Sequence, residues 1–209
     1  MNAQTERLTL QGPQGVIEAL CDRPEGGLPV RGVAVVAHPH PLFGGTMDNK
    51  VVQTLARAFV QCGWVAMRFN FRGVQGSAGH YAEGIGEVDD MLAVVRQAAP
   101  EGALALAGFS FGAHVASHVA ARLVEQRAIF KLVLVGTAAS RFDVAPVAPD
   151  LHLQTLVLHG EQDDTVALAD VMAWARPQSL PVTVIPGGGH FFHGQLPLLK
   201  NLVVRHLCC

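Results

Sequence analysis

A serine stands at the centre of the pentapeptide Gly108-Phe109-Ser110-Phe111-Gly112. A compact apolar run at residues 103–107 precedes it and indicates a buried strand, and residues 113–124 carry apolar side chains at helical spacing. A Gly-x-Ser-x-Gly pattern between a strand and a helix is typical of a nucleophile elbow, whose strained turn lifts the serine hydroxyl clear of the backbone. A Cβ at either glycine is expected to collide within so sharp a turn. The sequence therefore predicts that Ser110 is a nucleophile at the positive end of a helix.

A serine hydroxyl is a weak nucleophile at neutral pH, so it needs a base in contact and an acid that orients the base. In open α/β sheets the site lies at the carboxyl ends of the strands, so the base must follow a strand. The histidines in such positions are His38, His40, His159, His190 and His193. We predict His190 as the base because three glycines follow the last strand and let the chain fold back over the sheet. His193 is the leading substitute.

The acid is expected after the strand that ends at His159. Asp163 is three residues past Gly160 and three before an apolar anchor, and we predict it as the orienting acid. Asp164 and Asp143 are alternatives. Adjacent side chains point in different directions, so only one of the two neighbouring aspartates can reach the histidine, and the other is a candidate cap for the next helix. The chain order of serine, aspartate and histidine is the one that a nucleophile elbow leads us to expect.

An oxyanion hole needs two backbone N–H groups. One is expected from Phe111, the residue after the nucleophile, and the other from the loop after the third strand. Pro39 and Pro41 in that loop have no N–H to donate, which leaves His40 or Leu42. We predict the amides of Phe111 and His40.

Several phenylalanines could form the apolar walls of a substrate pocket, although each could equally pack in the core. They are Phe43, Phe109, Phe111, Phe191 and Phe192. We predict that Phe43 and Phe191 contact the substrate. The pocket is expected between residues 38–47, residues 137–152 and the Phe191-Phe192 pair, and to be apolar and shallow. Esters of small to medium acyl chains are the substrates that suit such a pocket.

Strands and helices alternate along most of the chain. The patterns predict a hairpin from residues 6–10 and 16–20, then strands at 32–37, 64–71, 103–107, 131–136, 153–159 and 182–185. Helices are predicted from a cap at Asp48 or Asn49 to near Gly63, and at 85–98, 113–124, 167–175 and 198–207. This order predicts an α/β fold with a doubly wound, mostly parallel sheet and right-handed crossovers.

The composition of the 209-residue chain restricts its partners. Hydrophobic residues make up 50% and charged residues 15%, which suits a sheet covered on both faces and a single domain over residues 1–209. A net charge of −2 without a basic patch argues against nucleic acid and membranes as partners, so a small-molecule substrate is expected. The polar start and the lack of an apolar run of about 18 residues predict a cytoplasmic protein. Monomer and homodimer both remain open.

The cysteines show neither metal-ligand spacing nor a disulfide framework, so free thiols are expected at Cys21, Cys62, Cys208 and Cys209. The glycine-rich segment at residues 72–79 lacks the Gly-x-Gly-x-x-Gly pattern of a dinucleotide site. We therefore expect neither a cofactor nor a metal.

Three segments carry a resemblance to a known family: residues 38–52, Phe71-Arg72-Gly73 and the pentapeptide around Ser110. Together they resemble a group of small bacterial hydrolases of the α/β-hydrolase superfamily, and the resemblance covers essentially the whole chain. It implies an eight-stranded sheet that starts with a hairpin, and esterase-like chemistry at Ser110, Asp163 and His190. Many relatives insert a lid after the sixth strand, where this chain has only residues 137–152, so an open site is expected.

Other functions remain open. Thioesterases and peptidases use the same serine, histidine and aspartate. A metal-dependent hydrolase could use His38 with His40, or His114 with His118, but neither pair has a third ligand nearby in the sequence. A non-catalytic binding module is also possible because a fold alone does not give a function. We disfavour it because a binder has no need of a strained elbow.

Overall fold

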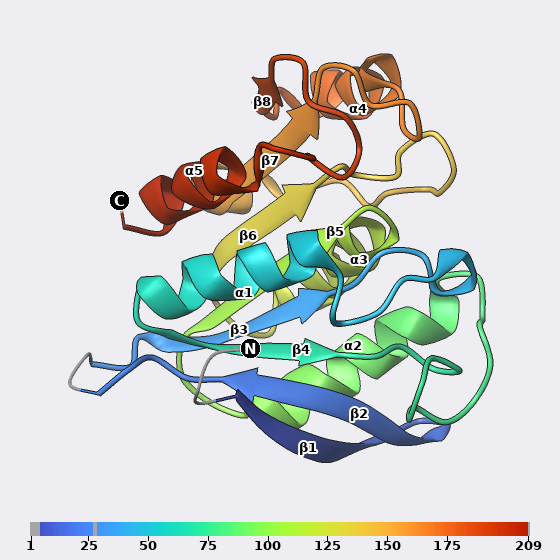
Figure 1. Ribbon diagram of the computed structural model, residues 1–209, viewed down its shortest axis with the longest axis vertical. Helices are drawn as coiled ribbons and strands as arrows, with labels where there is room; N and C mark the ends of the chain where they lie inside the picture. The colour runs from blue at the N-terminus through green and yellow to red at the C-terminus, as the bar shows by residue number, and fades with distance from the viewer. Residues whose placement is uncertain (1–4, 27–28, 209) are drawn as a thin grey trace.

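Eight strands form one sheet in the part of the chain that the computed structural model describes, residues 5–26 and 29–208 (Figure 1). The strands are β1 (Thr5–Gly12), β2 (Gly15–Asp22), β3 (Gly32–Ala37), β4 (Trp64–Phe69), β5 (Leu104–Phe109), β6 (Ile129–Val135), β7 (Thr155–Gly160) and β8 (Val182–Ile185). Their order across the sheet is β1-β2-β4-β3-β5-β6-β7-β8. β2 pairs antiparallel with β1 and β4, and the other neighbours pair parallel. The expected mostly parallel sheet with an N-terminal hairpin is confirmed.

Helices cover both faces of the sheet. One face carries α1 (Lys50–Gln61) and α5 (Leu196–Cys208), and the other carries α2 (Ile85–Ala98), α3 (Phe111–Leu123) and α4 (Leu168–Ala175). Short 3₁₀ helices lie in the described connections: η1 (Pro41–Phe43), η2 (Pro149–Gln154) and η3 (Arg176–Gln178). No helix in the described ranges combines the length and the hydropathy that crossing a membrane requires.

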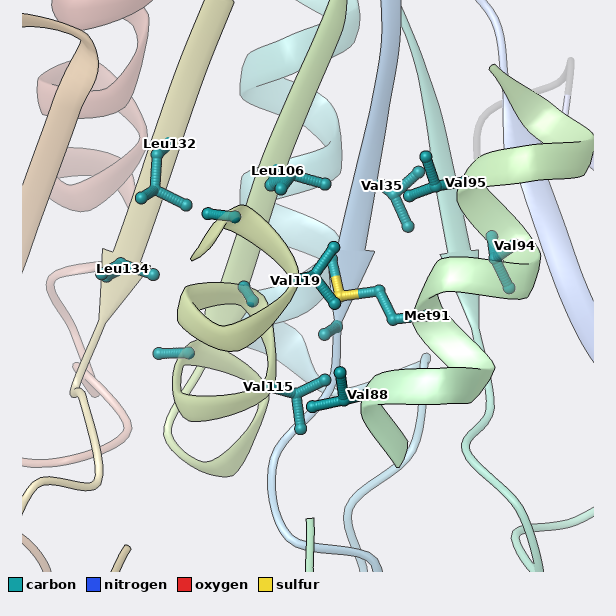
Figure 2. Packing of buried hydrophobic residues seen from close by; sticks show 14 of the residues in the cluster. Val35, Val88, Met91, Val94, Val95, Leu106, Val115, Val119, Leu132 and Leu134 are labelled. Carbon is teal, nitrogen blue, oxygen red and sulfur yellow. The ribbon is translucent and has the colours of Figure 1, made fainter. Parts of the chain in front are cut away.

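Alternate residues of the central strands feed two separate cores. In β5, Leu106 belongs to the core beneath α2 and α3, while Ala107 belongs to the core beneath α1 and α5. Figure 2 shows the first of these cores, where Met91 of α2 and Val119 of α3 meet Val35 and Leu106 from the sheet. Because both faces are covered, the strands read as continuous apolar runs. Because these side chains are buried, the strands are held in place. The points at which the loops leave the sheet are therefore fixed as well.

The fourth strand is shorter than the sequence predicts. We expected it to span residues 64–71, but β4 ends at Phe69. The Asn70 amide still donates to the Glu18 carbonyl of the neighbouring strand β2, but the Phe71 amide donates to Nε2 of the His38 side chain at 3.0 Å. The chain leaves the sheet at Phe71, where an N–H group finds a side-chain partner. This histidine therefore ties the loop after β3 to the loop after β4.

The seventh strand starts later than expected, at Thr155 instead of residue 153. Pro149 opens the 3₁₀ helix η2, and Leu153 in that helix is 90% exposed. The Thr155 hydroxyl donates to the Leu151 carbonyl and holds the end of this turn. In the sequence, a leucine just before a strand is easily taken as part of that strand. Leu153 is instead exposed to solvent.

The thiols at Cys21, Cys62 and Cys208 are free, as expected. Cys62 follows α1 and Cys208 ends α5, and their Sγ atoms lie 3.1 Å apart. Cys209 lies outside the described residues, so the expectation of a free thiol there stays a prediction.

Candidate active site

Ser110 occupies the turn between β5 and α3 in an unfavourable backbone conformation. Its φ is 57° and its ψ is −116°, backbone angles that residues other than glycine rarely adopt. The Ser110 amide donates to the Val135 carbonyl of β6 at 2.8 Å, which holds the turn against the sheet. α3 begins at the next residue, Phe111, so the positive end of its dipole lies at the serine.

The two glycines of the elbow are needed for different contacts. A Cβ at Gly108 would collide with the backbone of Gly112, as the sharp turn leads one to expect. A Cβ at Gly112 would instead collide with the carbonyl groups of Ala37 and His38 at the end of β3. The second glycine therefore lets α3 approach the neighbouring strand, which brings the loop after β3 close to Ser110.

The structure brings His190 and Asp163 to Ser110. Nε2 of His190 lies 3.0 Å from Ser110 Oγ, and Nδ1 lies 2.7 Å from Asp163 Oδ2. Asp163 comes from the loop after β7, and His190 comes from the glycine-rich loop after β8. All three are buried, with exposures of 8% for Ser110, 9% for Asp163 and 4% for His190. The three predicted side chains thus form one hydrogen-bonded chain.

The environment of Asp163 keeps its carboxylate charged. Burial by itself raises the pKa of Asp163, but the hydrogen bonds from His190 and from the amides of Val166 and Thr165 outweigh burial and lower the pKa. Oδ1 accepts from the Thr165 amide at 2.9 Å and from the Val166 amide at 2.8 Å. A carboxylate only accepts hydrogen bonds, so Nδ1 of His190 must carry the proton and Nε2 is left to accept from Ser110.

The alternative acids and the alternative base lie elsewhere. Asp164 is exposed, its Oδ1 accepts from the Thr165 hydroxyl at 3.3 Å, and it does not cap the next helix, whose N-cap is Ala167. The carbonyl of Asp143 contacts Nε2 of His118 at 2.7 Å. His193 is exposed beside Phe191, with ring centroids 6.0 Å apart.

Two residues that line the cavity at Ser110 have backbone N–H groups without an acceptor in the described part of the chain. Neither Phe111 N–H nor His40 N–H has a hydrogen-bond acceptor among the described residues, and both residues line the cavity that contains Ser110. The Leu42 amide, the alternative donor, is engaged by Nδ1 of His40 at 3.2 Å. The geometry therefore leaves the predicted pair of amides available to an oxyanion.

Comparison with known proteins shows the family to which the chain belongs. Residues 49–180 match the family described as “Thioesterase domain”. A protein of Rickettsia prowazekii that is described only as uncharacterized is 32% identical over 197 residues, which cover 89% of this chain and 82% of that protein. The chain belongs to the thioesterase-domain family of the α/β-hydrolase superfamily.

Solved structures of similar sequence share the fold over almost the whole chain. A lidless α/β serine hydrolase from Xanthomonas campestris is 37% identical, with a TM-score of 0.87 over 99% of this chain and 95% of that one. An α/β serine hydrolase homologue from Coxiella burnetii is 39% identical, with a TM-score of 0.81 over 97% of each chain. In this α/β hydrolase too, the connection after β6 holds no inserted domain.

The hydrolase has a cavity of about 380 Å³ at Ser110. Its walls come from the loop after β3, the connection after β6 and the loops after β7 and β8. The sequence predicts the first two of these and Phe191, but not the loop after β7, and the predicted Phe192 is not part of the lining. Phe43 and Phe191 both line the cavity, with 78% and 44% of their surfaces exposed. Phe109 and Phe192 are fully buried in the core instead.

Sequence reasoning missed Arg141, which also lines this cavity. Arg141 lies in the connection after β6, which the sequence analysis places beside the pocket. That position is the feature of the sequence that could have identified Arg141. A single arginine in an irregular segment has no spacing that would mark it as functional.

The remaining histidines in the loops support the structure. His38 is fully buried, and its ring contacts the Pro39 carbonyl through Nδ1 and accepts from the Phe71 amide through Nε2. Burial lowers the pKa of His38 to about 4, so its imidazole is neutral. His159 is buried behind the acid, with Nε2 3.0 Å from the Val166 carbonyl and 3.5 Å from Asp163 Oδ2. Both rings therefore fix loops that carry the site.

The histidine pairs considered as metal ligands have other contacts. The His40 ring lies against aromatic neighbours, including Phe111 at 5.1 Å between centroids. The His114 ring stacks on Phe142 and meets the His118 ring edge-on at 4.7 Å. Within residues 5–26 and 29–208, no three His, Cys, Asp or Glu side chains form a group that could hold a metal ion.

Proposed function

We propose that the protein hydrolyses carboxylic esters of small to medium acyl chains through an acyl-enzyme on Ser110. The observation that carries this proposal is the continuous hydrogen-bonded chain from Asp163 through His190 to the Ser110 hydroxyl, which opens on a cavity. Membership of an α/β-hydrolase family and the likeness to a lidless serine hydrolase support it.

The first half of the reaction forms the acyl-enzyme. Nε2 of His190 takes the proton from the Ser110 hydroxyl as Oγ attacks the ester carbonyl carbon. The carbonyl oxygen becomes an oxyanion, which the amides of Phe111 and His40 and the positive end of α3 stabilise. The charge that appears on His190 is stabilised by the ionised Asp163 at 2.7 Å.

The second half releases the product. The protonated His190 gives its proton to the ester oxygen of the leaving group as the tetrahedral intermediate collapses, and the alcohol departs. A water molecule then gives a proton to Nε2 and attacks the acyl carbon. As the second tetrahedral intermediate collapses, Nε2 returns that proton to Ser110 Oγ, the bond between Oγ and the acyl carbon breaks, and the carboxylic acid leaves. The strained φ of 57° at Ser110 helps because it holds Oγ at the base throughout both halves.

The size and walls of the cavity suggest the range of substrates. A volume of about 380 Å³ is at the small end of ligand sites in proteins. Phe43 and Phe191 offer apolar contact to an acyl chain, and their exposure leaves the mouth open to solvent. Short to medium chains therefore fit, and a long chain would extend into water.

Thioesters are the second candidate, because the matching family is described as “Thioesterase domain”. The same steps apply with a thiolate as the leaving group, which needs less help from a general acid than an alkoxide does. Comparing kcat/KM for p-nitrophenyl butyrate and for the butyryl thioester of N-acetylcysteamine would separate the two. A strong preference for the thioester would move it to first place.

Labelling with a fluorophosphonate tests the proposal. We expect the probe to label the wild type and the matched control Ser140→Ala, which changes an exposed serine after β6, but not Ser110→Ala. Intact-mass spectrometry reads the result. A folded wild type that takes up no probe and hydrolyses neither substrate would falsify the proposal and favour a binding module on the same fold.

A further inference from the structure

Arg141 is the formally charged side chain in the wall of the active-site cavity. Among the described residues that line this cavity the others are apolar, polar or histidine. Burial and the nearby Arg141 both lower the pKa of His40. Arg141 therefore brings the formal positive charge among the described residues that line this cavity.

The guanidinium of Arg141 has no protein partner in the described ranges, neither a carboxylate within 4.0 Å nor a side-chain hydrogen bond. Arg68, Arg72 and Arg122 each pair with an aspartate at 2.7–2.8 Å. The backbone around Arg141 is nevertheless fixed, because its amide and that of Phe142 donate to the Ala138 carbonyl. A positioned backbone thus presents a guanidinium with all its donors free.

Arg141 and Phe142 also line a second cavity of about 400 Å³, whose walls carry charges of both signs. They include Glu83 and Asp143 as well as a second arginine, Arg122, which pairs with Asp89. Among the described residues that line the Ser110 cavity there is no carboxylate. An anion bound to Arg141 in the Ser110 cavity therefore meets no competing carboxylate in its lining, whereas in the second cavity it does.

We propose that Arg141 determines specificity by binding an anionic group on the substrate, a carboxylate or a phosphate carried by the ester or thioester. This inference rests on the proposed hydrolysis at Ser110 and names its substrate class. A guanidinium offers five N–H donors in a plane that matches such groups. The anion can sit in the acyl part or in the leaving group, and the tests below separate these sources.

A matched pair of substrates tests the acyl source. Mono-p-nitrophenyl glutarate and p-nitrophenyl pentanoate have acyl chains of equal length, and only the first ends in a carboxylate. We expect Arg141→Gln to lower the ratio of their kcat/KM values, anionic to neutral, by roughly two- to fivefold, the effect of one charge-assisted contact with an exposed guanidinium. Arg141→Glu should lower the ratio further. Arg96→Gln, an exposed arginine on α2 away from the cavity, should leave it unchanged.

A second pair places the anion in the leaving group: 4-(pentanoyloxy)benzoate and phenyl pentanoate. An Arg141-dependent preference for the anionic member of either pair supports the inference and shows which part of the substrate reaches the guanidinium. Raising the ionic strength should weaken that preference, because an exposed pair is screened by salt. Ratios that are the same in the wild type, Arg141→Gln and Arg141→Glu for both pairs would overturn the inference while leaving the proposed hydrolysis intact. A wild type that cleaves none of the four esters would overturn both.

Discussion

Two buried clusters of hydrogen bonds lie at the carboxyl end of the sheet, and they differ in what is left unpaired. After β4, the Nε and backbone amide of Arg72 donate to Asp90 Oδ2 at 2.9 and 3.1 Å, and Nη2 donates to Asp90 Oδ1 at 2.7 Å and to the Gly86 carbonyl at 2.6 Å. At Ser110 the chain of hydrogen bonds ends at a hydroxyl, beside amides without acceptors in the described part of the chain. We call the first cluster saturated because both oxygens of Asp90 accept hydrogen bonds from Arg72, and such a cluster fixes loops. A cluster with free donors can bind a reacting group.

The two clusters also differ in whether a proton can move within them. Hydrogen bonding to Asp90 raises the pKa of the Arg72 guanidinium above its ordinary value, so the guanidinium keeps its charge at every physiological pH. In the other cluster the base is the imidazole of His190, whose Nε2 lies 3.0 Å from the Ser110 hydroxyl and can exchange a proton with it. The same ingredients, a buried aspartate and a nitrogen partner, therefore hold a loop in one place and can move a proton in the other.

The largest expected effect is on turnover in Ser110→Ala. Removing the hydroxyl removes the nucleophile, and we expect kcat to fall by roughly 10³ to 10⁶-fold on any ester that the wild type cleaves. The fold should survive, because the Ser110 amide that bonds to Val135 is retained. Steady-state kinetics and thermal unfolding check the two halves of the expectation. Unchanged turnover would end the role of Ser110.

Asp163→Asn should come next, with kcat lower by about 10⁴-fold, because an amide in this place no longer stabilises the charged imidazole and can select the wrong tautomer. Asp164→Asn is the matched control, since residue 164 is exposed and its Oδ1 accepts from the Thr165 hydroxyl, while the carboxylate at His190 is that of Asp163. We expect the control to keep most of the activity. If the two neighbours lost activity equally, the assignment of the acid to Asp163 would fail.

Asp90→Asn tests the saturated cluster and should act on stability instead of turnover. It leaves the buried guanidinium of Arg72 without a counter-charge, which costs about 3–5 kcal/mol of unfolding free energy. The control is Asp89→Asn, whose partner Arg122 is half-exposed at 49% and whose loss should cost about 1 kcal/mol or less. Urea unfolding measures both. A large fall in kcat of the folded Asp90→Asn protein would break the division between the clusters.

The contrast also separates what the sequence could predict from what it could not. Local patterns placed Ser110 at a turn, Asp163 after β7 and His190 after β8, because apolar runs and glycines report backbone geometry directly. The Arg72–Asp90 pair joins a loop to a helix, and no spacing along the chain specifies which charges will meet.

The same limit explains the wrong end of β4 and the missed arginine. The ladder stops where the Phe71 amide finds the ring of His38, a partner 33 residues away. Arg141 acquires its place in the cavity wall only when the connection after β6 folds over the site. Contacts of this kind are properties of the packed molecule, so they are found in the structure and not in a local pattern.

The smallest expected effect concerns His38, whose two ring nitrogens both have hydrogen-bond partners. Burial lowers the pKa of His38 from its ordinary 6.5 to about 4, so the unfolded chain binds a proton there at a higher pH than the folded protein does. The stability that the neutral ring allows is fully present above pH 6.5. It is lost as the pH falls from 6.5 to about 4, a loss of about 3 kcal/mol.

Urea unfolding of the wild type, His38→Gln and His193→Gln across this range checks the assignment. His38→Gln removes the titrating group, so the slope of unfolding free energy against pH should become shallower, whatever stability the variant has at neutral pH. His193 is exposed, and its replacement should leave the slope as it is. If His38→Gln kept the full slope, the proton uptake would belong to another group. Protonation of His38 would then not be the cause of the pH-dependent stability.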